Sequence, residues 1–555
     1  MKINFTKISF SAWLQILFVY TLIVYTSGIF VTLMEPDATV YADIPMEMVK
    51  NNNYLEINLK GQDWLDKPHF QFWITSIAYK LFGINNFGYK FPAILFSLLG
   101  IYYTFLFGKR FYSIRHGFIA AIVLMTAEHF ILSNNDVRAE PYLVALTMIS
   151  MYYFASYLDN KKLIHLVFGS VGLAGLLMTK GLFTILPVAS GIGFSLFYEK
   201  KWKDIINWQW VLVLFLILVS ISPTLISYYI QFDMHPEKEI FGQTEVSGIK
   251  FFLWDSQWGR FMNTGPIKGE GDPFFFLHTM IWSFAPWAFL AFTGIFVKIK
   301  ELINAKSTVE KYTIFGFLFT FIIFSMSRFQ LPHYLNQLFP FMSIVCANVL
   351  LANNRNYRFL KTHYYLQLFT IALLLSLIVL LHTSFFDRLP EIDVFAVLLI
   401  SFLFSFYIIY KEKTLVKKIL IAPALIILAL NYYMNRQFYP AVLKYQSESE
   451  LAFYIKENKL PVENLVAFEK TQWSTDFYLE RVIPMIYEDD LSQINLSGNL
   501  VFSTEEGLNI LNKYGYRIKP IKTFVDFHVT SLTSEFINKK SRKNALKNTY
   551  LVSVQ

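Results

Sequence analysis

The sequence predicts a mostly α-helical protein that crosses a membrane about thirteen times and ends in a small α/β domain. Of its 555 residues, 55% are hydrophobic and only 16% are charged. Soluble chains contain about 45–50% apolar and about 25% charged residues, so one buried core cannot hide this surplus. Apolar runs of membrane-spanning length recur along the chain, and this composition also excludes a disordered protein.

The predicted spans follow one another from the N-terminus to about residue 433. A helix needs about 17–25 mostly apolar residues to cross ~30 Å of hydrocarbon. Runs of this kind lie at 12–34, 88–108, 116–133, 141–158, 163–179, 182–198, 208–230, 274–297, 312–327, 335–352, 364–383, 391–410 and 416–433. The first run is too long for the apolar part of a signal peptide, so we interpret it as an uncleaved span.

Basic residues in the connecting segments predict the orientation, because Lys and Arg are retained on the cytoplasmic side. With thirteen spans and a cytoplasmic N-terminus, basic residues from Lys2 to Lys418 dominate the inner segments, and acids dominate the outer ones. If a shorter candidate at 69–86 also crossed the membrane, every later loop would face the opposite side. We therefore expect it to lie in the outer interface as an amphipathic or re-entrant helix. The net charge of +9 comes largely from the basic residues of the predicted cytoplasmic segments, so it does not indicate a nucleic-acid partner.

The last part of the chain, 434–555, differs from the rest. Short β-like runs such as LVAF and IKTFVDFHV alternate there with helical stretches such as SESELAFYIKEN. This alternation predicts an extracytoplasmic α/β domain beside a membrane domain at 1–433. The one cysteine, Cys346, lies in an apolar run, so no intramolecular disulfide can form.

Two long outer loops, about 35–87 and 231–273, are the first places to expect a site. The first loop holds two groups of ionisable residues: Asp37 and Asp43 on either side of Tyr41, and the tripeptide Asp66-Lys67-Pro68. On spacing alone, a solvated loop with ordinary charges is an equally good interpretation. Arg260 lies in the second loop, where a solvated arginine is the simpler reading.

Further ionisable residues lie at the predicted outer ends of spans. Glu140 begins the fourth span, where a carboxylate is costly unless it is paired or faces a wet cavity. A local pair with Arg138 is the alternative. Lys180 ends the fifth span, where a lysine is more often an interfacial anchor than a ligand. Arg328, His333 and Tyr334 cluster around a proline that interrupts another apolar run.

Carboxylates and cations on one side of a membrane suit a reaction in which a phosphate is the leaving group. Lysine and arginine neutralise a phosphate, while a carboxylate deprotonates the acceptor. The sequence contains no phosphate-binding glycine loop, dinucleotide signature or zinc-protease motif. It requires no cofactor, and a divalent metal is possible but not predicted.

Several of these segments resemble the membrane-spanning GT-C glycosyltransferases, in particular the bacterial aminoarabinose (lipid A) transferases and the related dolichyl-phosphate-mannose protein mannosyltransferases. The segments are EPDATVYADIPMEMV, DKPHFQFW, NNDVRAEPYL, LLMTKGL, FAPW and SRFQLPHYLNQLFP, within about residues 10–350. At Ala38 and Val40 the chain departs from the acidic and basic residues that many members carry.

The resemblance implies a sugar donor linked to a polyprenyl phosphate and an acceptor that is a lipid or a protein. It assigns Asp37 as the catalytic base and Glu140 as a second catalytic acidic residue. It places Lys67, Arg260 and Tyr334 on the donor phosphate. The supporting residues that it implies are Tyr41, Asp43, Asp66, Arg138, Lys180, Arg328 and His333.

Two other classes of function remain open at this point. A transporter or lipid flippase would place its ionisable residues near the middle of the bilayer, whereas here they gather at outer helix ends. A non-catalytic scaffold would not need Asp37 or Lys67. In every case the protein is expected in the inner membrane, among lipids.

Overall fold

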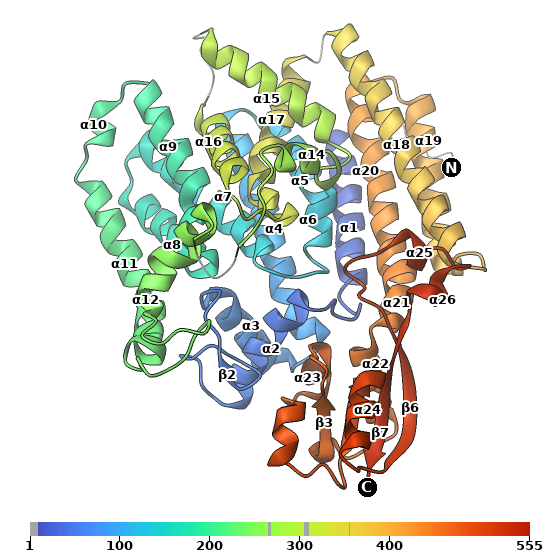
Figure 1. The fold of residues 1–555 in the computed structure, drawn as a ribbon. Coiled ribbons are helices and arrows are strands. Elements are labelled where there is room, and N and C mark those ends of the chain that lie inside the picture. Colours follow the sequence, from blue (N-terminus) through green and yellow to red (C-terminus); the bar gives the residue numbers. More distant parts are fainter. Residues whose placement is uncertain (1–8, 265–267, 305–309, 354–355) are drawn as a thin grey trace.

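The computed structural model describes residues 9–264, 268–304, 310–353 and 356–555, and it is mostly helical (Figure 1). Each predicted run overlaps one helix or two consecutive helices, although the first helix ends at Ser27, before the predicted end at 34; Lys2 lies outside the described residues. The helices are α1 (Phe10–Ser27), α4 (Asn86–Phe111), α5 (Ile114–Met125) with α6 (Glu128–Leu132), α7 (Glu140–Asn160), α8 (Leu163–Lys180), α9 (Leu186–Tyr198), α11 (Gln209–Tyr228), α14 (Phe275–Ser283) with α15 (Ala288–Ile303), α16 (Tyr312–Met326), α17 (Phe339–Ala352), α18 (Tyr357–Phe385), α19 (Ile392–Lys411) and α20 (Leu415–Tyr433).

Within these described ranges, eight helical segments are long and apolar enough to cross a membrane. They contain α1, α4, α8, α11, α17, α18, α19 and α20. The shorter apolar helices α5, α9 and α16 pack among them. These findings confirm a mostly helical, multi-span membrane protein.

The predicted interfacial segment forms α3 (Phe70–Phe82), which lies with α2 (Asp37–Lys50) beyond one end of the bundle (Figure 1). At 1.5 Å per residue, a helix of 13 residues is about 20 Å long, shorter than the hydrocarbon layer. A two-stranded hairpin, β1 (Asn58–Leu59) and β2 (Gln62–Asp63), connects α2 to this helix. The first long loop is therefore an ordered layer at the end of the bundle.

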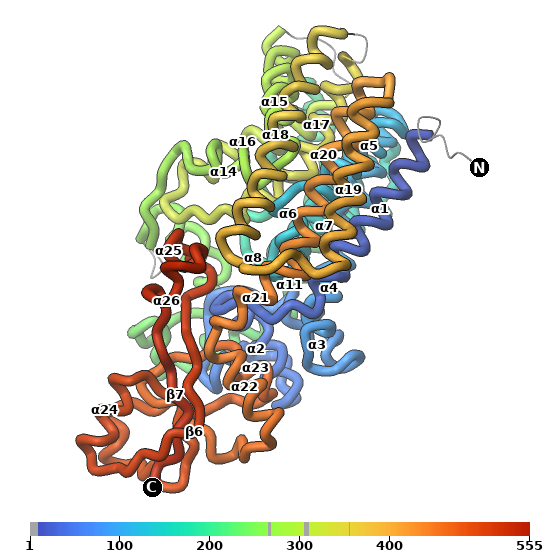
Figure 2. The backbone as a smooth tube through the Cα atoms, turned by 90° about the vertical axis from the view of Figure 1, so that its right-hand side faces the viewer, coloured from blue at the N-terminus to red at the C-terminus, as the bar shows by residue number. Residues whose placement is uncertain are grey.

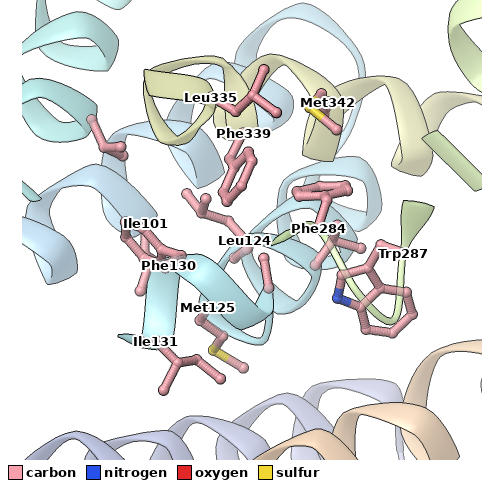
Figure 3. Close-up of a cluster of buried hydrophobic side chains, with 14 of the residues drawn as sticks. Ile101, Leu124, Met125, Phe130, Ile131, Phe284, Trp287, Leu335, Phe339 and Met342 are labelled. Atoms are coloured by element: carbon pink, nitrogen blue, oxygen red, sulfur yellow. The ribbon is translucent and has the colours of Figure 1, made fainter. Parts of the chain in front are cut away.

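Large apolar side chains fill the middle of the bundle. Figure 3 shows part of this core, where Leu124 and Phe130 meet Phe284, Trp287 and Phe339. Trp287 is fully buried, and its indole N–H donates to Thr126, which lies at the break between α5 and α6, at 3.1 Å. A hydrogen bond of this kind satisfies the polar end of a ring that would otherwise be costly to bury.

The C-terminal region (residues 434–555) forms a five-stranded sheet with the order β4-β3-β5-β7-β6. Its strands are β3 (Leu465–Phe468), β4 (Met485–Ile486), β5 (Leu500–Thr504), β6 (Ile518–Asp526) and β7 (Lys547–Val554). The first three are parallel, and β7 and β6 are antiparallel. The helices α22 (Ser447–Glu457) and α24 (Glu505–Lys513) cover opposite faces, because their apolar residues belong to separate clusters.

The C-terminal region contacts both the helical bundle and the layer that holds the first long loop. The long β6–β7 ribbon extends to α25 (Ser534–Ile537) and α26 (Arg542–Ala545) (Figure 2). There the Arg542 guanidinium lies 3.7 Å from the ring centre of Phe385, at the end of α18. On its other side, α23 (Ser474–Leu479) packs against α2. The region is thus attached to the layer that holds the first long loop.

Candidate active site

The predicted site residues converge at the end of the bundle that carries α2, α3 and the C-terminal region (Figure 1). Asp37 is the first residue of α2, and Glu140 is the first residue of α7. Lys180 ends α8, whereas Arg260 follows a π-helical turn, Phe251–Gly259, in the second long loop. Segments far apart in the sequence thus present ionisable side chains to one another.

Asp37 pairs with Arg138. An Asp37 carboxylate oxygen lies 2.7 Å from the Arg138 guanidinium, which also binds Asp136 at 2.8 Å. The Asp37 side chain is 51% exposed, whereas that of Arg138 is 20% exposed. The guanidinium therefore holds an accessible carboxylate in place, where it can reach an acceptor proton.

Glu140 pairs with Lys180 and not with Arg138, so the local pair considered above is not the arrangement found. The Lys180 ammonium donates to the Glu140 carboxylate at 2.7 Å, and that carboxylate is 3% exposed. The His333 imidazole lies 3.7 Å from the same carboxylate. Gly181, at a φ of 89°, ends α8 directly after Lys180, and a side chain there would meet Gln257. Glycine thus permits the turn that leaves Lys180 facing Glu140.

Asp66 bridges two cations. Its carboxylate contacts the Lys67 ammonium through one oxygen and the Arg260 guanidinium through the other. Burial lowers the pKa of Lys67 to about 8, against the opposing effect of Asp66. Burial raises the pKa of Asp66, but the charges of Lys67 and Arg260 outweigh it and bring this pKa below its usual value. Two cations from different loops therefore meet at one anionic group, which is the geometry expected of a phosphate site.

Tyr334 lies beside this bridge and lines a cavity. The Lys180 ammonium lies 4.3 Å from the centre of the Tyr334 ring. The cavity is mostly aromatic and apolar, and its lining residues are Leu143, Lys180, Phe183, Thr184, Ser256, Gln257, Arg260, Phe261, Ile323, Phe324, Ser327, Phe329, Tyr334 and Gln337. The apolar and aromatic members of this set were not predicted from the sequence. A cavity with cations on an aromatic wall suits a phosphate attached to a hydrocarbon chain.

The other three predicted supporting residues lie in different surroundings. Tyr41 is near the pairs: burial raises its pKa, and the charges of Asp66 and Glu140 raise it further. Asp43 instead faces the C-terminal region, where burial and then Asp476 hold its pKa well above the usual value. Arg328 is exposed and forms no ion pair with the residues that the structure describes. Only Tyr41 of these three adjoins the proposed chemistry.

The described part of the chain contains no group of three or more His, Cys, Asp or Glu side chains arranged to hold a metal ion. The site instead presents an accessible carboxylate, a buried carboxylate with its lysine, and two cations at one anion. These groups can accept a proton at one point and neutralise a leaving phosphate at another.

Comparisons with known proteins show what the chain is similar to in sequence and in fold. The sequence model of the dolichyl-phosphate-mannose-protein mannosyltransferase family matches residues 66–226. An uncharacterised protein of Aquifex aeolicus is 24% identical over 81% of this chain and 83% of its own length. The undecaprenyl phosphate-alpha-4-amino-4-deoxy-L-arabinose arabinosyl transferase of Wigglesworthia glossinidia brevipalpis is 27% identical over 58% of this chain. That alignment spans 56% of the transferase, just over half of its length.

A solved structure is similar over almost the whole chain. ArnT from Cupriavidus metallidurans, crystallised with undecaprenyl phosphate, superposes with a TM-score of 0.75. The identity is 17%, and the alignment covers 98% of each chain. These matches confirm the resemblance that the sequence motifs predicted. The protein is a multi-span membrane protein with the fold of ArnT, and it resembles the GT-C glycosyltransferases of the aminoarabinose transferase type.

Proposed function

We propose that the protein is a glycosyltransferase that moves a sugar from a polyprenyl-phosphate carrier to a lipid or protein acceptor. One observation carries this proposal: Lys67 and Arg260 converge on a single carboxylate, and Arg260 also lines the aromatic cavity. The arabinosyl transferase relatives are named for an undecaprenyl-phosphate donor, and the similar ArnT crystal structure contains undecaprenyl phosphate. Both facts support a donor of this class.

In the proposed reaction, an acceptor hydroxyl oxygen forms a bond to the anomeric carbon of the sugar as the bond from that carbon to the phosphate oxygen breaks. The polyprenyl phosphate leaves with the bonding electrons, and Lys67, Arg260 and Tyr334 stabilise its growing charge. Asp37 takes the acceptor proton. Glu140 fixes Lys180 next to Tyr334 and contributes a second carboxylate near the sugar.

Transfer can be tested with purified protein in nanodiscs. The reactions contain undecaprenyl-phosphate-linked aminoarabinose or an undecaprenyl-phosphate hexose, with lipid A as one acceptor, and mass spectrometry follows both substrates. Lipid A and envelope glycoproteins from cells with and without the gene are compared in parallel. A sugar added only when the protein is present supports the proposal. Translocation of lipid in vesicles without any transfer would favour the flippase alternative.

The orientation follows from the same proposal. Thirteen spans with a cytoplasmic N-terminus place the C-terminal region outside the inner membrane as a separate domain, on the same side as Asp37 and Lys67. We expect alkaline phosphatase fused after Gln555 to be active, and a fusion in the loop after Lys411 to be inactive. The opposite result for the two fusions would require either an even number of spans or an N-terminus outside the membrane, and this orientation would be wrong.

A further inference from the structure

The residues just before Asp37 are held by side chains of the C-terminal region. The Leu33 carbonyl accepts from the Gln446 amide at 3.0 Å, and the Glu35 N–H donates to the same amide at 3.1 Å. Gln446 therefore satisfies one carbonyl and one N–H of this segment through a donor and an acceptor. The Leu33 N–H donates to the Tyr478 hydroxyl at 2.9 Å.

The Glu35 side chain adds a fourth connection. Its carboxylate accepts from the backbone N–H of Ser474 at 3.2 Å and from the Ser474 hydroxyl. Ser474 is the first residue of α23, so this N–H is one of those that a helix leaves without an internal partner. The carboxylate thus caps the helix that packs against α2.

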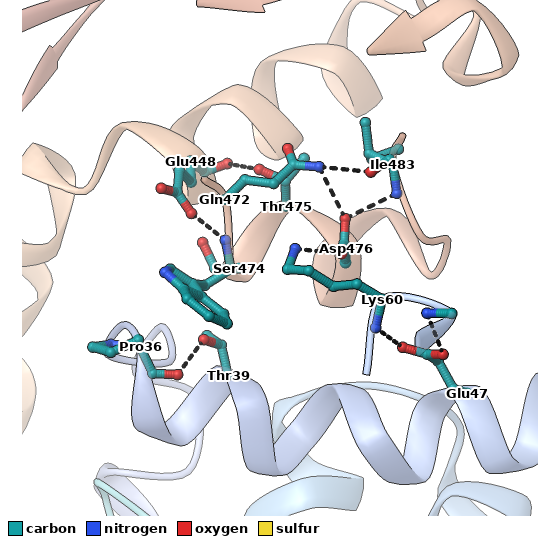
Figure 4. A network of polar contacts seen from close by, with 12 residues as sticks. Pro36, Thr39, Glu47, Lys60, Glu448, Gln472, Ser474, Thr475, Asp476 and Ile483 are labelled. Carbon is teal, nitrogen blue, oxygen red and sulfur yellow. Dashed lines mark hydrogen bonds and ion pairs between the residues drawn. The ribbon is translucent and has the colours of Figure 1, made fainter. Parts of the chain in front are cut away.

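A second set of contacts holds the far end of α2, as Figure 4 shows. The Glu47 carboxylate accepts from the backbone N–H groups of Lys60 at 2.6 Å and Gly61 at 3.0 Å. The Lys60 ammonium in turn lies 2.9 Å from Asp476 of α23, whose side chain is 2% exposed. The C-terminal region therefore contacts α2 and its flanking segments at both ends.

The Asp37 side chain itself is held by fewer contacts than the segment before it. Its side chain is half exposed, and Arg138 is its ion-pair partner in the described residues. The position of the carboxylate thus depends on where the backbone enters α2. That entry point is fixed by Leu33 and Glu35, and hence by Gln446.

We infer that the C-terminal region completes the active site by positioning Asp37, with Gln446 as the principal positioning residue. This inference rests on the proposed function, because it concerns the base of that reaction. Gln446 is 1% exposed and touches no residue of the donor site, so its contribution should appear in the rate and not in donor binding. A displacement of about 1 Å in a catalytic group can cost about a hundredfold in rate.

The test compares Gln446→Met with Gln472→Met. Gln472 is a matched control, because it is equally buried in the same region but bonds to Asp476 and the Ile483 carbonyl, so it adjoins the contact at the far end of α2 and not the segment before Asp37. We expect Gln446→Met to lower the single-turnover transfer rate by about 10- to 100-fold. Its affinity for undecaprenyl phosphate should stay within about twofold of the wild-type value, and Gln472→Met should leave both quantities nearly unchanged.

Two further measurements separate positioning from loss of structure. If Gln446 acts through Asp37, then Gln446→Met in an Asp37→Asn background should slow the residual reaction no further, whereas independent effects would multiply. Hydrogen exchange of the peptide covering residues 31–40 should accelerate in Gln446→Met and not in Gln472→Met, whether or not a sugar is present.

The outcomes distinguish the two proposals. If the wild-type protein transfers no sugar, the proposed function fails. If the wild type is active but the two methionine variants are equally fast, or if the Gln446 and Asp37 effects multiply, the positioning role is wrong and the proposed function stands.

Discussion

Asp37→Asn is expected to reduce sugar transfer by a factor of about 10²–10⁴, the contribution typical of a general base. The amide keeps the shape of the side chain but loses its basicity and its charge toward Arg138. Donor binding should change little, because the expected phosphate contacts come from Lys67 and Arg260. The measurement is the single-turnover rate of purified variants, together with their affinity for undecaprenyl phosphate.

Asp136→Asn provides the control for that experiment. Asp136 binds the same guanidinium at a similar distance, 2.8 Å against 2.7 Å, but it is not assigned to the acceptor. We expect at most a roughly tenfold loss for this variant, since Arg138 keeps its contact with Asp37. Turnover of Asp37→Asn within a few fold of the wild-type value would remove Asp37 from the mechanism.

The helices could be predicted from the sequence because bilayer thickness imposes a length on each apolar run. Every predicted run from 12–34 to 416–433 overlaps a helix in the structure. Several runs contain breaks that were not predicted. The run 274–297, for example, divides into α14 and α15. Hydropathy indicates whether a segment is apolar, but not whether its backbone hydrogen bonds continue without a break. Breaks within a helical run therefore cannot be predicted from it.

The site could be predicted only as a set of residues, without their pairing. Sequence neighbours suggested that Glu140 pairs with Arg138, but its partner is Lys180, forty positions away. Asp43 was predicted as a supporting residue of the site, but it lies six residues after Asp37 on the same helix and faces the C-terminal region. No motif marks Gln446, because its role depends on backbone groups of a segment more than 400 residues earlier. Contacts of this kind are fixed by the tertiary fold.

The donor site gives the second large expected effect. Lys67→Ala and Arg260→Ala should each weaken undecaprenyl phosphate binding by roughly ten- to a hundredfold, since a hydrogen bond to a charged group contributes about 1.5–3 kcal/mol. Lys67→Ala should also slow the chemical step, because negative charge grows on the phosphate as the sugar bond breaks. Asp66 already bridges both cations, so a bound phosphate must share them or displace its carboxylate.

Lys238→Ala is the matched control. Lys238 also connects the two long loops, through an ion pair with Asp63 at 3.0 Å, but that pair is separate from the bridge that Asp66 forms between Lys67 and Arg260. If the phosphate binds at Lys67 and Arg260, this variant should bind undecaprenyl phosphate nearly as well as the wild type. Equal losses in all three alanine variants would instead indicate that the ion pairs only hold the loops together.

The pH dependence tests the role of Lys67 directly. Burial gives the free protein a Lys67 pKa of about 8, so the ammonium is charged below that pH and loses its proton as the pH rises through it. Because phosphate binds the charged form, undecaprenyl phosphate affinity should be highest below pH 8 and should fall above it. Lys67→Arg should bind more weakly at neutral pH, since a planar guanidinium does not reproduce a compact ammonium, but it should lose this pH dependence. An unchanged pH profile in Lys67→Arg, or unchanged affinity in both Lys67→Ala and Arg260→Ala, would place the donor phosphate elsewhere.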